Sequence, residues 1–166
     1  EPEATKLGVM LPCYTASKNI NTIGGMVGNN SAGEKTLYYG KMENYINELR
    51  VVFGDGNEYV IKPLSKIELD KKISQRDFEG KIYEKIWDIV SKNADLLAGA
   101  KPKVSKNSAG YYIWKVWDGK KFDITKLIVG SQGTLGIVTE ITMRRGPIKP
   151  VSKLFVIFLP IVSRLG

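Results

Sequence analysis

The sequence predicts an α+β fold, because hairpin patterns and one long amphipathic helix occur along the same chain. Residues 45–61 are typical of a β-hairpin, residues 76–100 of the main helix, and residues 136–145 of a further strand. Hairpins pair neighbouring strands in antiparallel fashion, so antiparallel pairing is expected. The 166 residues, 43% of them hydrophobic and 25% charged, fit one domain whose core needs no disulfide or metal.

A glycine-rich segment near the start of the chain, residues 22–33, reads TIGGMVGNNSAG. Thr22 is a suitable N-cap for a short helix through Met26 and Val27. Glycines and small residues let another surface or a ligand approach the backbone closely. Glycine content alone favours tight turns and packing contacts over a ligand site.

The predicted hairpin has a clear turn signal. Tyr45 to Phe53 is apolar and β-branched, Asp55-Gly56 indicates a two-residue turn, and Glu58 to Ile61 forms the return strand. Pro63 lacks a backbone N–H and ends the hairpin.

The main helix is predicted from Arg76 to Ala100. Its apolar residues recur at spacings of three and four, so they share one face, and charged residues occupy the other. Gly99 and Pro102 are its stop signals. The apolar stripe consists of Phe78, Ile82, Ile86, Ile89, Val90 and Leu97.

A polar loop is expected at residues 103–110. Residues 111–117 and 121–124 flank an Asp-Gly pair and are compatible with a second hairpin. A short helix is predicted within residues 123–129. The aromatic residues of this region favour a core over a base-stacking surface, and they are Tyr111, Tyr112, Trp114 and Trp117.

A second glycine-rich segment, residues 130–140, reads GSQGTLGIVTE and leads into the last predicted strand. The alternation of that strand places four residues on one face, namely Ile137, Thr139, Ile141 and Met143. Pro147 and Pro150 then mark a linker. We therefore expect one unit over residues 1–146, followed by residues 147–166 as a linker and the first strand of a further domain. That strand, residues 153–159 (KLFVIFL), would be exposed and favours self-association.

Charge and composition narrow the function classes. The net charge is +8, but the lysines are scattered, which favours a solvated basic surface over a nucleic-acid site. Histidine is absent, which argues against zinc chemistry and against Ser-His or Cys-His catalysis. The single cysteine, Cys13, cannot form an internal disulfide, which favours a cytoplasmic setting. No apolar run reaches the ~20 residues of a membrane span.

The order and spacing of the two glycine-rich segments resemble those of the FAD-linked oxidase family. The resemblance covers about residues 11–145 and includes TIGGMVGNNSAG, LYYG, ELRVVFGDG, NSAGYYIW and LIVGSQGTLGIVTEITM. This family has the FAD-binding fold of vanillyl-alcohol oxidase and p-cresol methylhydroxylase (PCMH). It includes the glycolate oxidase flavin subunit, the D-lactate dehydrogenases and the D-2-hydroxyglutarate dehydrogenases.

The resemblance implies that the chain is the second subdomain of a PCMH-type FAD-binding fold, a mainly antiparallel β-sheet flanked by α-helices, with FAD as the cofactor. The first glycine-rich segment would contact the ribityl chain, the pyrophosphate and the isoalloxazine edge of FAD, and the second the adenosine end. The residues expected to bind FAD are Ser17, Thr22, Ile23, Gly24, Gly25, Asn29, Gly33, Gly136, Ile137 and Val138.

The resemblance also implies that parts of the family's enzymes lie outside this chain. A phosphate-loop subdomain would precede residue 1, and a substrate-binding cap would begin near Lys153, so the chain is expected to be a fragment that is inactive alone. In the family the catalytic base, the substrate-binding arginines and the metal ligands lie on the cap. No catalytic or metal-binding residue is therefore assigned to this chain. Gln132 stands where the family usually has Glu, and Ser31-Ala32-Gly33 stands for Ala-Gly-Gly; both changes preserve small size and turn chemistry.

Three polar or reactive residues near the first glycine-rich segment have two interpretations each. Some proteins of this wider fold attach flavin covalently through Cys or His, but a free buried thiol is favoured for Cys13. Asn29 and Asn30 either orient the flavin ring or brace the turn, since asparagine tolerates left-handed backbone geometry.

The function implied by the resemblance is FAD binding within a flavin-dependent oxidoreductase that acts on a 2-hydroxyacid such as glycolate or D-lactate. FAD and, through the missing cap, the 2-hydroxyacid are then the expected partners. Two alternatives come from other classes: a flavin-free binding or structural module of the same fold, and a basic nucleic-acid-binding domain, which would need lysines clustered beside exposed aromatic residues.

Overall fold

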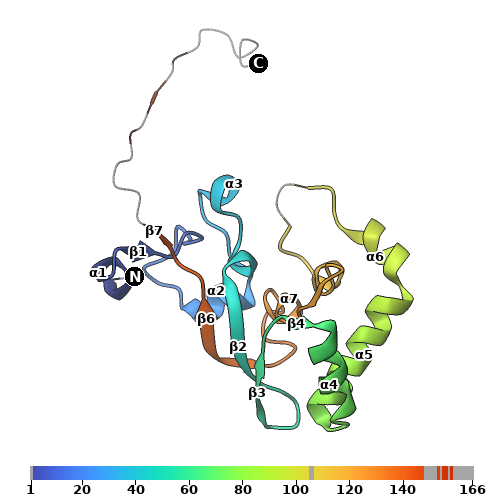
Figure 1. The fold of residues 1–166 in the computed structure, drawn as a ribbon. Helices are drawn as coiled ribbons and strands as arrows, with labels where there is room; N and C mark the ends of the chain where they lie inside the picture. The colour runs from blue at the N-terminus through green and yellow to red at the C-terminus, as the bar shows by residue number, and fades with distance from the viewer. Residues whose placement is uncertain (1, 105–106, 148–152, 154, 157, 159–166) are drawn as a thin grey trace.

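The fold was analysed in a computed structural model that describes residues 2–104, 107–147, 153, 155, 156 and 158 (Figure 1). Three strands form the central sheet, with α4, α5 and α6 together on one side of it and α1, β1 and β7 on the other (Figure 1). All strand pairs of the described residues are antiparallel. The prediction of an α+β fold with an antiparallel sheet flanked by helices is confirmed.

The central sheet has the order β3-β2-β6, with β2 (Ile46–Val52) in the middle, β3 (Glu58–Ile61) on one edge and β6 (Ile137–Met143) on the other. The predicted hairpin is therefore confirmed, and so is the predicted last strand. The turn of the hairpin is one residue longer than predicted. The N–H of Gly56 donates to the carbonyl of Phe53 at 3.0 Å, and Gly56 has a φ of 80°. Gly56, in left-handed backbone geometry, completes the three-residue loop of the hairpin. The turn within this loop begins at Phe53.

A β-bulge in β6 changes the face that its side chains present. Arg50 pairs with Glu140 but Val51 pairs with Val138, so Thr139 is an extra residue on β6. A bulge of this kind shifts the alternation by one residue. Val138 packs against the core together with Ile141 and Met143, and the side chain of Ile137 is 69% exposed. The prediction that Ile137 and Thr139 share a face with Ile141 and Met143 is wrong for this reason.

The predicted main helix is in fact two helices, α5 (Phe78–Lys92) and α6 (Ala94–Ala100). Asn93 separates them with a φ of −121° and a ψ of 27°. Its side-chain amide donates to the carbonyl of Ile89 at 2.8 Å, which competes with the helical hydrogen bond there. The N–H of Leu97 donates to the carbonyl of Asn93, so the chain resumes a helix at once.

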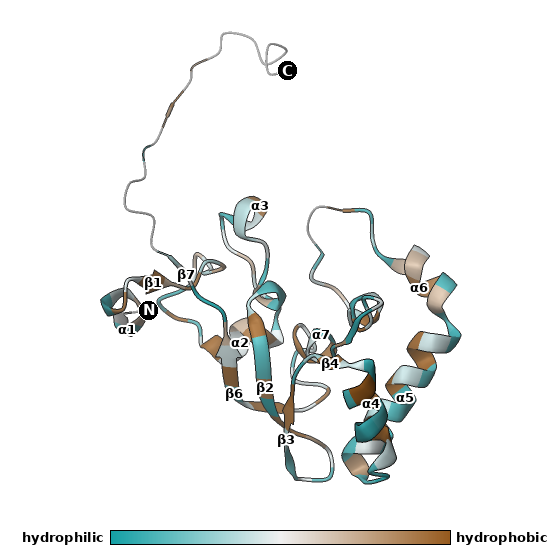
Figure 2. Ribbon diagram, viewed as in Figure 1, coloured by the Kyte–Doolittle hydropathy of each residue, from teal (hydrophilic) through white to brown (hydrophobic). Residues whose placement is uncertain are grey.

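The face of α5 that reaches the core is also offset from the predicted stripe. Tyr83 and Val90 are buried, whereas Phe78 and Ile89 are 41% and 49% exposed. The ring of Tyr83 packs 6.0 Å from that of Phe122, so α5 presents its aromatic side to β5. Figure 2 shows hydrophobic and hydrophilic residues alternating along α5.

The hairpin is followed by two elements that the sequence analysis did not assign, β4 (Leu64–Ser65) and α4 (Lys66–Ser74). Ser65 and Glu68 form a capping box at the start of α4, with the Ser65 N–H donating to Glu68 Oε2 at 2.7 Å. The spacing S-x-x-E is a sequence signal that could have located this helix.

The predicted second hairpin is only partly present. Residues 113–115 form a 3-10 turn, η2 (Ile113–Lys115), and a single bridge joins Trp117 to Phe122. The return strand β5 (Lys121–Phe122) pairs instead with β4. The predicted short helix is confirmed as α7 (Thr125–Ile128). The prediction of an aromatic core is confirmed for Tyr112, which is 3% exposed, and not for Tyr111, which is 46% exposed.

The first residues of the chain form short elements. These are α1 (Pro2–Lys6) and β1 (Val9–Met10), and β1 pairs with β7 (Gly146–Pro147). The other short elements are α2 (Ile23–Gly28), α3 (Thr36–Tyr39) and η1 (Met42–Asn44). Residues 154, 157 and 159 of the predicted strand at residues 153–159 lie outside the described residues. Its four described residues are not assigned to a strand, and the side chains of Phe155, Val156 and Phe158 are 84%, 64% and 90% exposed.

Candidate cofactor-binding site

The two glycine-rich segments meet at the carboxyl end of α2. The N–H of Gly130 donates to the carbonyl of Val27, and that of Gln132 to the carbonyl of Gly28, each at 2.9 Å. These main-chain bonds join residues that are about a hundred positions apart in the sequence. The loop from residue 130 to residue 133 is thereby fixed against the short helix, and the two predicted segments form one site.

Helix α2 begins as predicted. The Thr22 hydroxyl accepts a hydrogen bond from the Gly25 N–H at 3.0 Å, which is the N-cap contact. The helix ends at Asn29, and the N–H of Ser31 donates back to the carbonyl of Met26 at 2.9 Å. Met26 and Val27 are buried, so the core side of α2 is anchored and its glycine side faces outward.

The loop after α7 depends on left-handed backbone geometry. Gly130, Gln132 and Gly133 have φ values of 90°, 55° and 78°. Glycine adopts this region readily, but glutamine does so at a cost of order 1 kcal/mol. Two contacts of Gln132 offset that cost: its N–H bonds to Gly28, and its side-chain amide donates to Asn29 Oδ1 at 3.2 Å.

A cavity of about 370 Å³ lies between α2, this loop and the start of β6, and we call it the glycine cavity. It is lined by Gly24, Gly25, Gly28, Ile128, Ser131, Gln132, Gly133, Gly136, Ile137 and Val138. A Cβ atom added to Gly24, Gly28 or Gly133 would meet no atom within 4 Å. These three glycines therefore leave main chain open to the cavity.

The lining of the glycine cavity is uncharged. Exposed glycine main chain and small side chains suit a flat ring or a sugar chain that lies against the backbone. The lining offers hydrogen-bonding groups to a phosphate but no cationic side chain. These residues fit the ring and ribityl parts of a flavin nucleotide, and the phosphate charges would need a cation from elsewhere.

Two of the sequence-predicted glycines serve packing. A Cβ on Gly33 would lie 1.8 Å from the carbonyl oxygen of Tyr14, and one on Gly136 would lie 2.6 Å from Val51 Cγ1. Gly33 thus allows the residue 31–35 turn to contact the segment before α2. Gly136 lines the glycine cavity, but its missing side chain makes room for β2.

The structure brings together half of the residues expected to bind FAD. Gly24, Gly25, Gly136, Ile137 and Val138 line the glycine cavity. The other five residues are outside its lining. Thr22 is the helix cap, Asn29 bonds to Gln132, and Gly33 packs against Tyr14. Ile23 is 44% exposed on α2, and Ser17 is exposed beside Thr15, with the two hydroxyl oxygens 3.0 Å apart. Contact of these ten residues with FAD stays a prediction.

Five lining residues were missed by the sequence analysis, namely Gly28, Ile128, Ser131, Gln132 and Gly133. Four of them lie within the glycine-rich segments already identified, so the signal was present. Ile128 carried no signal, because its place in the lining depends on how α7 packs.

Asn30 and Cys13 have structural roles. Asn30 is 1% exposed with a φ of 46°, and its Oδ1 accepts a hydrogen bond from the Glu43 N–H at 3.1 Å, so it braces the turn. The expectation that Cys13 is free and buried is confirmed: its Sγ lies 3.4 Å from Met42 Sδ. Burial raises the pKa of the Cys13 thiol to about 11, so the thiol is protonated near neutral pH.

Comparison with known proteins indicates the same cofactor, FAD. Residues 1–62 match the family model described as an FAD binding domain. The chain is 26% identical over 140 residues to D-2-hydroxyglutarate dehydrogenase of Pantoea ananatis (strain AJ13355), a match that covers 83% of this chain and 14% of that protein. It is 30% identical over 146 residues to glycolate oxidase subunit GlcD of Bacillus subtilis (strain 168), covering 88% of this chain and 20% of that protein.

A third relative is D-lactate dehydrogenase of Archaeoglobus fulgidus, which is 25% identical over 144 residues, covering 87% of this chain and 21% of that protein. These matches confirm that the chain is related to the FAD-linked oxidases. The cofactor they indicate is FAD, and the homologues are oxidoreductases that act on hydroxyacids. The chain spans about a fifth or less of the length of these curated relatives.

Within the part of the chain that the structure describes, none of the helices has the length and apolar character needed to cross a membrane.

Proposed function

We propose that this chain binds FAD through the glycine cavity and contributes that cofactor site to an oxidoreductase of 2-hydroxyacids. The observation that carries the proposal is the joining of the two glycine-rich segments around one uncharged cavity. FAD supplies a hydride acceptor for the α-carbon of the substrate. The protein's part is to bind and orient the cofactor and to leave its ring free of steric conflict.

The residues of the cavity divide this work. Gly24 and Gly28 expose main chain on α2, and Gly133 exposes it on the facing loop. Ile137 and Val138 follow at the start of β6, where the bulge turns Ile137 outward. We assign the ribityl and ring contacts to the α2 side and the adenosine contacts to residues 136–138. No catalytic residue is assigned to this chain.

The 2-hydroxyacid substrate is part of the proposal, and it would bind through a cap outside this chain. The names of the relatives support this substrate class, since they act on D-2-hydroxyglutarate, glycolate or D-lactate. A division of the chain at residue 146, self-association through residues 153–159 and a cytoplasmic location also belong to the proposal. The exposed side chains of Phe155 and Phe158 support the proposed self-association. The single cysteine supports the proposed cytoplasmic location.

Titration of the purified chain with FAD, followed by visible absorbance and flavin fluorescence, tests the proposal. We expect saturable binding with shifted flavin bands. Gly24→Leu should abolish it, because the Cβ at this position meets open space and the longer side chain would occupy the cavity. Gly99→Leu is the matched control: Gly99 is also helical and also has no atom within 4 Å of its added Cβ, but it lies on α6. Equal FAD affinities for the two variants would contradict the assignment.

A further inference from the structure

A second cavity, of about 240 Å³, lies between the segment that joins α3 to η1 and two described segments, residues 101–104 and 107–115. We call it the lysine cavity, and it shares no lining residue with the glycine cavity. Its lining is Thr36, Gly40, Lys41, Glu43, Asn44, Lys101, Pro102, Val104, Asn107, Tyr112, Trp114 and Lys115. Three ammonium groups and one carboxylate are among these residues, so positive charge is in excess.

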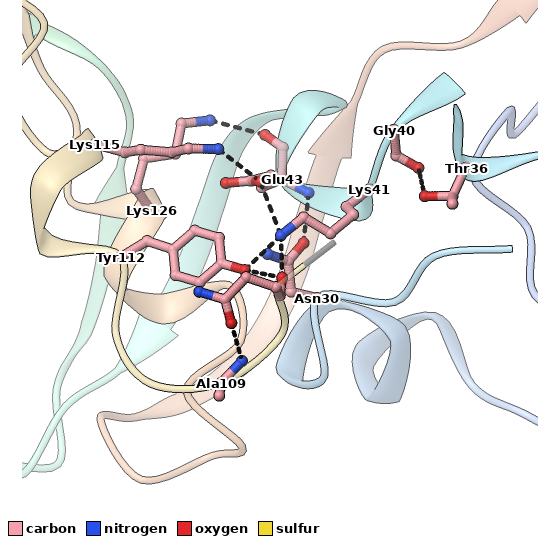
Figure 3. A network of polar contacts seen from close by, with 10 residues as sticks. Asn30, Thr36, Gly40, Lys41, Glu43, Ala109, Tyr112, Lys115 and Lys126 are labelled. Carbon is pink, nitrogen blue, oxygen red and sulfur yellow. Dashed lines mark hydrogen bonds and ion pairs between the residues drawn. The ribbon is translucent and has the colours of Figure 1, made fainter. Parts of the chain in front are cut away.

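The base of the lysine cavity is a buried ion cluster (Figure 3). The side chain of Glu43 is 3% exposed, and its Oε1 lies 2.8 Å from Lys115 Nζ and 3.4 Å from Lys41 Nζ. Lys41 also donates to the Tyr112 hydroxyl and to the carbonyl of Asn107. The three donors of Lys41 are thus engaged within the protein, and Lys41 and Glu43 form the fixed floor of the cavity.

Lys115 and Lys101 supply the positive charge that is available to a ligand. Lys115 Nζ donates one of its three N–H groups to Glu43, and the Lys115 side chain is 34% exposed. Lys101 is exposed and lines the same cavity. Glu43 neutralises only one of the three lysines, so the lining keeps an excess of two positive charges.

The remaining wall is aromatic and flat. The ring of Trp114 stacks on that of Tyr112 with a centroid distance of 5.0 Å. Lys41 Nζ lies 4.3 Å and Lys115 Nζ 5.3 Å from the centroid of the Tyr112 ring. These cation–π contacts fix the ammonium groups in a partly dry setting, where their attraction for an anion exceeds that of solvated surface lysines.

We propose that the lysine cavity binds a small dianion, such as hydrogen phosphate, a phosphate monoester or a short dicarboxylate. Two negative charges match the excess charge of the lining, and the cavity holds a compact group of this kind. The dianion would bind to Lys115 and Lys101. This site is independent of FAD and of the proposed oxidoreductase function.

Isothermal titration calorimetry of the cofactor-free chain at low ionic strength tests the proposal, with inorganic phosphate and succinate as probes and acetate as the monoanion. We expect saturable binding of phosphate or succinate and at least about tenfold weaker binding of acetate. Lys115→Gln and Lys101→Gln should each weaken the dianion by about tenfold, the effect of one lost charge-assisted hydrogen bond.

The control separates this site from the general basic charge of the chain. Lys120→Gln removes the same charge from an exposed position outside the cavity and should leave the affinity unchanged. Glu43→Gln removes the opposing carboxylate and should tighten binding; if that variant fails to fold, the lysine variants carry the test. An equal loss in Lys115→Gln and Lys120→Gln, or the absence of saturable heat with both dianions, would overturn the proposal.

Discussion

The glycine cavity and the lysine cavity differ in the groups that line them. The first is lined by main chain and uncharged side chains, with Gly24, Gly28 and Gly133 open to it. The second is lined by long charged side chains that a buried glutamate, Glu43, holds in place. A cavity made of main chain needs residues without side chains at fixed local positions, whereas a cavity made of side chains needs partners brought from several segments.

This difference decides how each region responds to substitution. In the glycine cavity a new side chain adds volume and leaves the fold intact wherever its Cβ meets open space. In the lysine cavity the removal of Glu43 leaves Lys41, whose side chain is largely buried, without its counter-ion. The two regions should therefore lose ligand binding and stability in different proportions.

The largest expected effect is the removal of the carboxylate beneath the lysine cavity. Glu43→Ala should lower the free energy of unfolding by about 3 kcal/mol, because Lys41 would stay partly buried without its counter-ion. Urea denaturation followed by circular dichroism measures the change. Glu140→Ala is the control, since the Glu140 side chain is 62% exposed and its bond to Arg50 is solvated. That variant should change stability by about 0.5 kcal/mol or less, and equal effects would remove the distinction between the two regions.

The next effect separates packing glycines from cavity glycines. Gly33→Ala should destabilise the fold by about 2–3 kcal/mol, since its Cβ would overlap the carbonyl of Tyr14 and the backbone must move. Gly24→Ala should instead be neutral or stabilising by up to about 1 kcal/mol, as alanine favours the helix more than glycine does. Thermal unfolding of the two variants would decide the matter, and a stable Gly33→Ala protein would mean that the close approach is absent.

A smaller effect concerns how the free energy of unfolding depends on pH through the buried thiol of Cys13. Burial raises the pKa of Cys13 from 9.0 to about 11, so the folded state holds the proton more tightly than the unfolded state. The resulting stability is complete below pH 9 and is lost as the pH rises toward 11, by roughly 2 kcal/mol. Free energies of unfolding measured at pH 7.5 and pH 10.5 should fall more for the unchanged protein than for Cys13→Ala. Parallel pH profiles would contradict the burial of the thiol.

The smallest effect lies in the side-chain contact between Asn29 and Gln132, beside the glycine cavity. A double-mutant cycle on Asn29→Ala and Gln132→Ala should give a coupling energy of about 0.5–1 kcal/mol, the net worth of one exposed side-chain hydrogen bond. The main-chain bond from Gln132 to Gly28 persists in both variants, so the loop should stay in place. A coupling energy of zero would mean that the main-chain bonds alone hold this loop against α2.

Features set by local geometry were predictable from the sequence. The cap at Thr22, the hairpin around Gly56 and the short helix α7 all depend on neighbouring residues, and each is present. The segments that form the glycine cavity were identified for the same reason. That both segments serve one cofactor was implied only by the family resemblance. Their contact at Val27 and Gly28 came from the structure, since no local rule joins residues that are a hundred positions apart.

Features that depend on competition between neighbours were not predicted correctly. Asn93 interrupts an otherwise continuous helical pattern because its side chain takes the carbonyl of Ile89. Thr139 bulges out of β6 and reverses the direction of Ile137. A periodic pattern cannot reveal either event, because both residues are compatible with the regular element.

The sequence by itself determined where main chain without side chains occurs, which turns and caps are available, and which class of cofactor protein the chain resembles. Only the tertiary structure decided that Gly24 faces a cavity while Gly33 faces a carbonyl, since the two glycines are alike until their neighbours are known. It also gathered Lys41 and Lys115 around the carboxylate of Glu43 and placed Lys101 in the lining of the same cavity. Charged side chains of this length carry no positional signal, because their place depends on packing between distant segments.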